Sequence, residues 1–312
     1  MTEQSIMTEI ASKSLGDSTS YAVYTDQYDP SLLNPMPRSI ARSENDISGD
    51  EFIGFDVWHC YESTFLTDKG HPISGVLKIV YPSNTKMMVE SKSMKLFLNS
   101  FDMCKMGDNV ALAIKNYENA VRKSLSDCLD DFRVEVKFFR HLDVVNKDLL
   151  VENKLVSDAS MFDILNYDED EDINLIYENP NQNYVTTIDE NINIHLMFES
   201  LRSRCRHTKQ KDTGTAIAIM KNANIEPLSI YKQINSMRET NEFHEFCSEK
   251  LFTEIVKESK FSDIVIALLY TRRGSLDINP IRYNKDISES SFIKYVAPFI
   301  DVNVLTEPTL IQ

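Results

Sequence analysis

Apolar and polar residues follow two different periods in the first half of the chain. Alternation with period two is typical of a strand with one buried face, and recurrence at three and four residues is typical of an amphipathic helix. These patterns predict strands at Gly75–Tyr81, Met87–Phe97 and Phe132–Phe139, and one long helix from Val110 to Cys128. Residues 1–50 are predicted to be irregular, because turn-forming pairs such as Asp29-Pro30 interrupt them.

The second half repeats this order of elements. Strands are predicted at Asn191–Met197, Gly214–Met220 and Asp263–Tyr270, with helices at Leu228–Met237 and Glu245–Val256 between the second and third strands. The repeat predicts an α+β protein of two tandem modules, each an antiparallel sheet with helices packed on one face. We expect an N-terminal extension over 1–50, a first module over 51–160, an acidic connector over 161–190 and a second module over 191–312.

The chain is strongly acidic, which narrows its partners. It has 312 residues, with 33 Lys and Arg against 48 Asp and Glu, and a formal net charge of −15. Nucleic acids and anionic membranes are therefore not expected as partners, because contact with phosphate needs local positive charge. The longest apolar run, Ile264 to Tyr270, is too short to span a bilayer. Any site for an anion must be a local basic segment.

Targeting and metal-binding signals are not expected either. The N-terminal sequence MTEQSIMTEI is acidic, unlike a signal peptide, and the five cysteines are scattered without a CxxC pair, so a reducing, cytoplasmic protein is predicted. The acidic connector carries Asp168, Asp170 and Asp172, which resemble the start of a calcium loop. However, Ile173 stands where such a loop needs glycine and Asn179 where it needs glutamate. No metal site is therefore predicted.

One cysteine lies in the basic segment SLRSRCRHTKQKDTG. Arginines and lysines surround Cys205, and neighbouring cations favour the thiolate, which is the nucleophilic form. Asp212 follows where a turn can bring its carboxyl group back to the sulfur. From these residues alone, a catalytic cysteine and an incidental cysteine in a basic surface loop remain equally good readings. Cys128 and Cys247 fall on apolar helix faces and are predicted to be core residues.

Two further segments carry candidate chemistry. His244 and Glu245 begin a predicted helix, where a carboxyl group can accept two hydrogen bonds from a guanine-type edge or simply compensate the helix dipole. Arg272 and Arg273 follow a predicted buried strand and stand just before Gly274, an arrangement that suits a phosphate but also ordinary surface charge. The chain contains neither GxGxxG nor GxxxxGK[ST], so side chains must hold any nucleotide cofactor.

The stretch Glu90-Ser91-Lys92-Ser93-Met94-Lys95-Leu96-Phe97 closely resembles the signature of one family, the NADPH-dependent 7-cyano-7-deazaguanine reductases. Similarity also covers LGDSTSY from Leu15, PRSIAR from Pro37, DVWHCYE from Asp56, NEFHE and YTRRGSLDINP. The resemblance spans nearly the whole chain and is to the long, two-module form of this family. It implies two tandem tunnelling-fold modules, a homodimer, and NADPH-dependent reduction of a nitrile to a primary amine in queuosine biosynthesis.

The resemblance also implies roles for individual residues. Cys205 matches the nucleophile that forms a covalent thioimide with the nitrile carbon, and Asp212 matches the proton donor. The remaining residues are implied to contact the substrate, NADPH or, for Ser91, both. The implied substrate contacts are Val89, Glu90, Ser91, His244 and Glu245, and the implied NADPH contacts are Ser91, Lys92, Arg273 and Gly274.

The chain departs from the family pattern near the cysteine. Lys211 replaces a usual proline and Thr213 a usual aromatic residue, so the loop before Asp212 is expected to be less rigid. Two other functions are compatible with parts of the pattern. The first is a related amidinotransferase that uses the thioimide without reduction, which the intact ESKSMK motif disfavours. The second is a non-catalytic deazapurine-binding protein, which is disfavoured by the retention together of Cys205, Asp212, His244 and Glu245.

Overall fold

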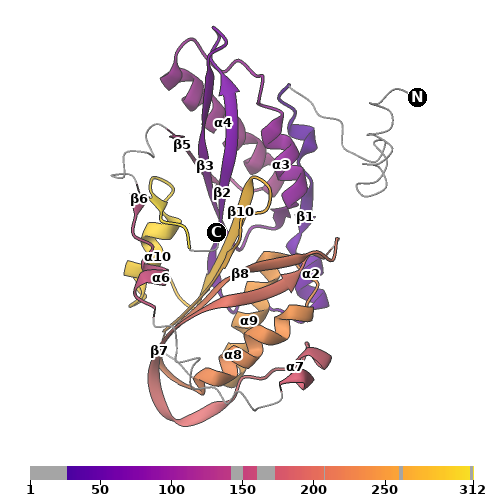
Figure 1. Cartoon of the computed structure of the whole chain (residues 1–312), viewed down its shortest axis with the longest axis vertical. Helices are drawn as coiled ribbons and strands as arrows, with labels where there is room; N and C mark the ends of the chain where they lie inside the picture. The colour runs from indigo at the N-terminus through magenta and orange to yellow at the C-terminus, as the bar shows by residue number, and fades with distance from the viewer. Residues whose placement is uncertain (1–26, 142–149, 160–172, 207, 260–262, 310–311) are drawn as a thin grey trace, which may run out of the picture.

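A seven-stranded antiparallel sheet organises the computed structural model, which describes residues 27–141, 150–159, 173–206, 208–259, 263–309 and 312 (Figure 1). The strands lie in the order β5 (Glu135–Arg140), β3 (Pro72–Pro82), β2 (Ile53–Leu66), β10 (Leu276–Tyr283), β9 (Asp263–Tyr270), β8 (Lys211–Ile225) and β7 (Thr187–Arg204). β2 pairs with β10 from Ile53↔Tyr283 to Cys60↔Leu276. The two halves of the chain therefore share one continuous sheet.

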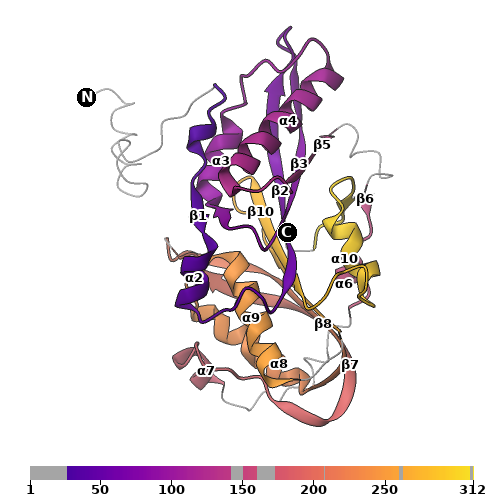
Figure 2. The same cartoon turned by 180° about the vertical axis from the view of Figure 1, so that it is seen from behind.

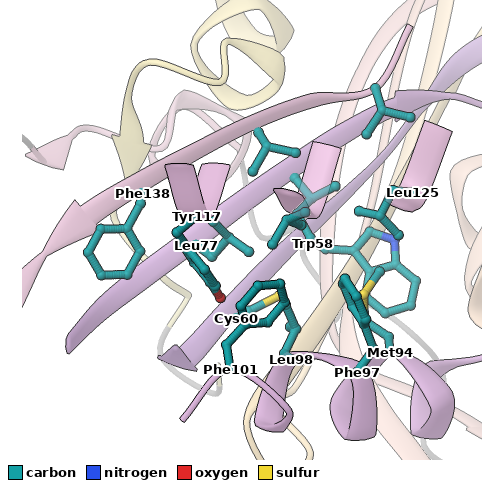
Figure 3. Close-up of a cluster of buried hydrophobic side chains, with 14 of the residues drawn as sticks. Trp58, Cys60, Leu77, Met94, Phe97, Leu98, Phe101, Tyr117, Leu125 and Phe138 are labelled. Atoms are coloured by element: carbon teal, nitrogen blue, oxygen red, sulfur yellow. The ribbon is translucent and has the colours of Figure 1, made fainter. Parts of the chain in front are cut away.

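Four helices cover one face of this sheet. α3 (Ser91–Asn99) and α4 (Val110–Leu129) pack on the strands of the first half, and α8 (Pro227–Ser236) and α9 (His244–Glu258) on those of the second. Figure 1 shows the two pairs beside the upper and lower halves of the molecule. Figure 3 shows the first of these cores, in which Met94 and Phe97 of α3 point toward Trp58 and Leu77 of the sheet.

The opposite face is also covered, so the expectation of helices on one face only is wrong. α10 (Ile293–Ile300) and the short α6 (Lys154–Ser157) pack there, with Phe299 and Leu155 among the residues buried against Val265 and Leu269 of β9. β9 shows why this face is covered: all of its residues are buried, on both faces of the sheet, so apolar side chains on the second face also need a covering layer. Two short strands next to these helices in the chain, β6 (Leu150–Val151) and β11 (Leu305–Thr306), pair as a small parallel sheet.

Most predicted elements are confirmed, with shifted ends. α4 has the predicted extent because Asn109 caps its N-terminus through Leu112 N, and Asp130 ends it in the left-handed conformation with φ 52°. The strands and helices predicted in the second half correspond to β7, β8, α8, α9 and β9. β5 begins only at Glu135, and Phe132 before it is 87% exposed. Cys247 is a core residue as predicted, and Cys128 is partly buried.

The strand predicted from Met87 to Phe97 is wrong beyond its first three residues. β4 (Met87–Val89) is followed at once by α3, because the apolar residues Met94, Phe97 and Leu98 recur at three and four. Glu90 caps the helix, its carboxylate accepting hydrogen bonds from the backbone N–H groups of Lys92 and Ser93. The alternation of serine and lysine in this stretch therefore comes from a first helical turn.

The N-terminal region is more regular than predicted. Among residues 27–50, β1 (Pro35–Pro37) pairs with β4, and α2 (Arg38–Glu44) lies beside α9 (Figure 2). Two long strands, β2 and β10, were not predicted. Within the predicted connector, α7 (Asn174–Glu178) and the start of β7 are described. Asp168, Asp170 and Asp172 lie outside the described residues, as does the LGDSTSY segment.

No helix in the described part of the chain is both long enough and apolar enough to cross a membrane.

Candidate active site

A cavity of about 580 Å³ lies where the two halves of the chain meet, and all ten residues expected in the site line it. The first half contributes the end of β4 and the start of α3; the second half contributes the β7–β8 connection, the start of α9 and the β9–β10 turn. The expected residues among its lining are Val89, Glu90, Ser91, Lys92, Cys205, Asp212, His244, Glu245, Arg273 and Gly274. A cavity of this size suits a small organic ligand.

Cys205 lies directly after β7 and is half-buried. Its backbone N–H donates to Gln210 O over 2.8 Å, and its carbonyl accepts from Lys209 N over 3.0 Å. Lys209 has φ 59°, the left-handed conformation that closes this tight connection. The connection therefore holds the thiol at the cavity wall, next to the first residues of β8.

Asp212 is nearly buried at the start of β8, with 3% of its surface exposed. Its Oδ1 atom accepts a hydrogen bond from Arg273 Nη1 and lies 3.4 Å from His244 Nε2. The His244 ring stacks on Tyr270 with 3.6 Å between centroids and 5° between planes. A carboxyl group, an imidazole and a guanidinium thus converge in the cavity that also receives the thiol.

Glu90 has a structural role in addition to its place in the cavity. As the N-cap of α3 it receives Lys92 N at 2.9 Å and Ser93 N at 2.7 Å, and its own backbone N–H donates to Asn34 O. Each carboxylate oxygen can accept more than one hydrogen bond, so the cap leaves capacity for donors on a ligand. Ser91, beside it, is exposed in the cavity.

Glu245 is the most deeply buried carboxyl group of the site, with 1% of its surface exposed. It lies near a charged cluster in which Arg282 Nη2 contacts Asp56 Oδ1 at 2.8 Å and Glu249 Oε1 at 3.0 Å. Burial, reinforced by the negative charge of Asp56, raises the pKa of Glu245 to about 8. Glu245 lines the cavity, and within the described residues its buried Oε1 has no hydrogen-bond partner.

Cationic side chains also line the cavity. Lys92 is exposed, and Lys95 comes from the next turn of α3. Gly274 has φ 62°, and a Cβ atom there would stand 2.9 Å from Lys95 Nζ, so glycine permits the close approach of turn and helix. Arg272 is not among the lining residues: its guanidinium donates to the carbonyl of Gly274, contacts Glu62 and lies 4.7 Å above the Tyr61 ring.

The basic segment around Cys205 is less positive than its sequence indicates. Arg204 pairs with Glu239 at 2.6 Å, and Arg206 pairs with Glu242 and Glu44. These partners come from distant parts of the chain, so the local sequence gives no sign of them. Asp212, for its part, contacts Arg273 and His244, whereas its sequence neighbour Lys211 has an exposed side chain.

Several lining residues were not assigned to the site from the sequence. They include Lys95 of the signature, Thr208 and Gln210 of the cysteine loop, and Phe243 beside His244. Each of these residues lies next to a sequence motif of the site, and that position in the sequence was the one indication of its role. Asn34 carried no such signal, because it reaches the cavity through the pairing of β1 with β4.

The chain is similar to known proteins over most of its length. Residues 24–138 match the family described as nitrile reductase, 7-cyano-7-deazaguanine-reductase, N-terminal. Curated relatives named NADPH-dependent 7-cyano-7-deazaguanine reductase, from the Coxiella burnetii strains RSA 331, CbuG_Q212 and Dugway 5J108-111, are each 31% identical over 271 residues. The alignments cover 86% of this chain and 90% of each relative. The chain belongs to the family of NADPH-dependent 7-cyano-7-deazaguanine reductases.

Proposed function

We propose that this protein uses NADPH to reduce the nitrile of 7-cyano-7-deazaguanine to the primary amine of 7-aminomethyl-7-deazaguanine, a step of queuosine biosynthesis. Family membership supports this activity. The observation that carries it is the shared cavity, in which Cys205 and Asp212 meet the start of the signature helix α3. Those residues are far apart in the chain, and only the fold brings them to one ligand.

The proposed chemistry begins at Cys205. Its sulfur forms a bond to the nitrile carbon, and one π pair of the C≡N bond moves to nitrogen, which takes up a proton. The thiol proton passes to Asp212 and from there to that nitrogen, so the step neither gains nor loses atoms or electrons. His244, 3.4 Å from the same carboxyl oxygen, is placed to assist this transfer.

Glu90 and Glu245 are proposed to recognise the base. A guanine-type edge presents N–H donors, and an ionised carboxylate accepts two of them in parallel. Because the pKa of Glu245 is raised to about 8, its carboxyl group is mostly protonated at neutral pH and must release that proton to accept both bonds. Substrate affinity should therefore improve as the pH rises toward 8.

The residues present fit a phosphorylated nicotinamide cofactor. Lys92 and Arg273 are exposed, positively charged residues of the cavity lining, one from each half of the chain, and Gly274 lets a ligand approach the backbone of the turn. We propose that these residues and Ser91 hold NADPH, which supplies hydride when bound, two equivalents for each nitrile. Val89 and Phe243 are buried or half-buried at the cavity wall, where they exclude water.

We further infer two tandem tunnelling-fold modules in each chain, a homodimer, and a cytoplasmic location. The α3 and α4 pair on β2, β3 and β5, and the α8 and α9 pair on β7, β8 and β9, support the modules. β10 adds Leu276 and Ile278 to the first of these cores, and β7 begins at Thr187, within the expected connector, so the boundaries stay a prediction. Within the described residues, β5 and β7 each have a strand partner on one side only. Pairing of such edges between two chains would cover both.

The test is to incubate the pure protein with 7-cyano-7-deazaguanine and follow the absorbance of NADPH. Reductase activity predicts oxidation of about two NADPH for each amine formed. A related amidinotransferase would form the covalent adduct without consuming NADPH, and a binding protein would do neither. Either of these results would contradict the proposed function.

A further inference from the structure

Arg273 is expected to contact the cofactor, yet its guanidinium donates to the Oδ1 atom of Asp212. The two residues are 61 positions apart, and the contact joins the β9–β10 turn to the start of β8. Asp212 has 4% of its side chain exposed and Arg273 has 38%. One end of the arginine therefore reaches a buried carboxyl group, while the remainder faces the mouth of the cavity.

The backbone holds this arginine in place. Arg273 N donates to Leu276 O over 2.8 Å, and Leu276 N donates back to Arg273 O over 3.3 Å, which closes the turn around Gly274. Thr271 N also donates to Thr213 O over 2.8 Å, so the turn is tied to the residue that follows Asp212. The geometry between guanidinium and carboxyl is thus set by backbone contacts on both sides.

A guanidinium has five N–H donors in a fixed plane, and the contact with Asp212 Oδ1 uses Nη1. The other donors remain for a phosphate at the mouth of the cavity. Arg273 therefore does not have to release Asp212 in order to bind the cofactor. The one side chain can orient the carboxyl group and contact a phosphate at the same time.

We propose that Arg273 is the positioning residue for Asp212 and acts in formation of the covalent adduct, before any cofactor is bound. This inference rests on the proposed function of Cys205 and Asp212. In the adduct step Asp212 receives the Cys205 proton and delivers it to the nitrile nitrogen. Both transfers need a fixed carboxyl oxygen, since proton transfer depends on hydrogen-bond distance. Arg273 supplies a charged, planar contact that fixes Oδ1 beside His244 Nε2.

The experiment measures the rate of adduct formation with 7-cyano-7-deazaguanine in the absence of cofactor, by rapid quench and intact-protein mass spectrometry. Arg273→Gln should slow adduct formation by about tenfold or more, and Arg273→Lys should restore part of the rate. Substrate affinity should change little. The melting temperature of each variant is measured beside the rate to show that it is folded, because Arg273 is a charged partner of the nearly buried Asp212. An arginine that serves the cofactor alone would leave this rate unchanged.

Arg272→Gln is the matched control. It removes the same charge from the same turn. Arg272 contacts Glu62, the Tyr61 ring and, through its Nε, the carbonyl of Gly274 over 3.0 Å, but not Asp212. Its adduct rate should equal that of the wild type. Equal losses in both variants would show that the charge or the shape of the turn, and not the Arg273 contact with Asp212, is responsible, which would overturn the inference.

A double-mutant cycle tests whether Arg273 acts through Asp212. In an Asp212→Asn background, adding Arg273→Gln should change the adduct rate by less than about twofold, because the shared interaction is already lost. A full, additive loss would contradict the inference. If the wild type itself forms no adduct, the proposed function fails and this inference fails with it. A wild-type adduct together with a normal rate in Arg273→Gln overturns the inference alone.

Discussion

Asp212 is the residue whose surroundings decide the proposed proton transfer. It is nearly buried and contacts Arg273 and His244 through one oxygen, so its position is set by partners from two other elements. Asp212→Asn keeps the shape of the side chain but cannot carry the proton. We expect adduct formation to slow by about a hundredfold or more, with substrate affinity little changed.

The measurement is the adduct rate in single turnover, beside the dissociation constant determined by calorimetry in a Cys205→Ala background. A normal adduct rate in Asp212→Asn would show that another group supplies the proton, and His244 would be the first to test. His244→Gln is the informative companion variant, because His244 Nε2 lies 3.4 Å from the same oxygen.

The helix α3 depends on Glu90 as its N-cap, so this residue combines a structural role with the proposed recognition of the base. Glu90→Ala should lower the free energy of unfolding by about 1 kcal/mol, because two backbone N–H groups lose their acceptor. It should also weaken substrate binding by roughly ten- to a hundredfold, through loss of a charged acceptor.

Glu90→Asn separates the two roles. Asparagine is a good N-cap but carries no charge, so stability should return while substrate affinity stays low. Denaturant unfolding and calorimetric titration measure the two quantities independently. Recovery of both together would show that Glu90 acts only as a cap.

The helix α9 begins with a buried carboxyl group, which should make stability depend on pH. In the folded protein burial raises the pKa of Glu245 to about 8, whereas in the unfolded chain it ionises near 4.5. Between these values the folded state binds more protons, so this group's contribution to stability falls as the pH rises from 4.5 to 8. Glu245→Gln removes that contribution.

As the pH rises from 5 to 8, the wild type should lose stability through Glu245 and the variant should not. The melting temperature of Glu245→Gln should therefore rise relative to that of the wild type over this range. At most a few kcal/mol is involved, because other members of the buried cluster titrate with Glu245. A difference that does not vary with pH would mean that Glu245 is already ionised in the folded protein.

At the scale of the whole molecule, the cations proposed to bind the cofactor come from both halves of the chain, Lys92 from the first and Arg273 from the second. Only NADPH carries the additional phosphate with which such cations can pair. We expect kcat/KM to be more than about tenfold higher with NADPH than with NADH, and Lys92→Gln to reduce that preference. Steady-state kinetics with both cofactors provides the measurement. Equal values of kcat/KM would rule out a phosphate contact at these residues.

The sequence predicted the class of fold because long periodic segments such as α4 and β9 bury one face or both. β10 escaped prediction because Pro280 interrupts its pattern, and its central place in the sheet depends on pairing with β2. α3 was assigned to a strand because its first turn alternates serine and lysine. In both cases a short local pattern indicated the wrong structure, because contacts with distant parts of the chain determine the element that forms.

The candidate site was predicted through resemblance to a family, residue by residue, and the cavity brings those residues together. The partners within the site were not predictable, because they join residues distant in the chain. Arg273 was expected to face a phosphate but contacts Asp212, and Arg206 was expected to surround Cys205 with charge but pairs with Glu44 and Glu242. Charge counted along a sequence does not reveal which charges are neutralised in the fold.

The most direct test of the proposed mechanism is intact-protein mass spectrometry of the enzyme with 7-cyano-7-deazaguanine and no NADPH. The wild type should gain the mass of one substrate molecule, and Cys205→Ala should gain none while retaining its melting temperature. Addition of NADPH should return the wild type to its original mass and release the amine. An adduct of the same mass on Cys205→Ala, or no adduct on the wild type, would contradict the assignment of Cys205 as the nucleophile.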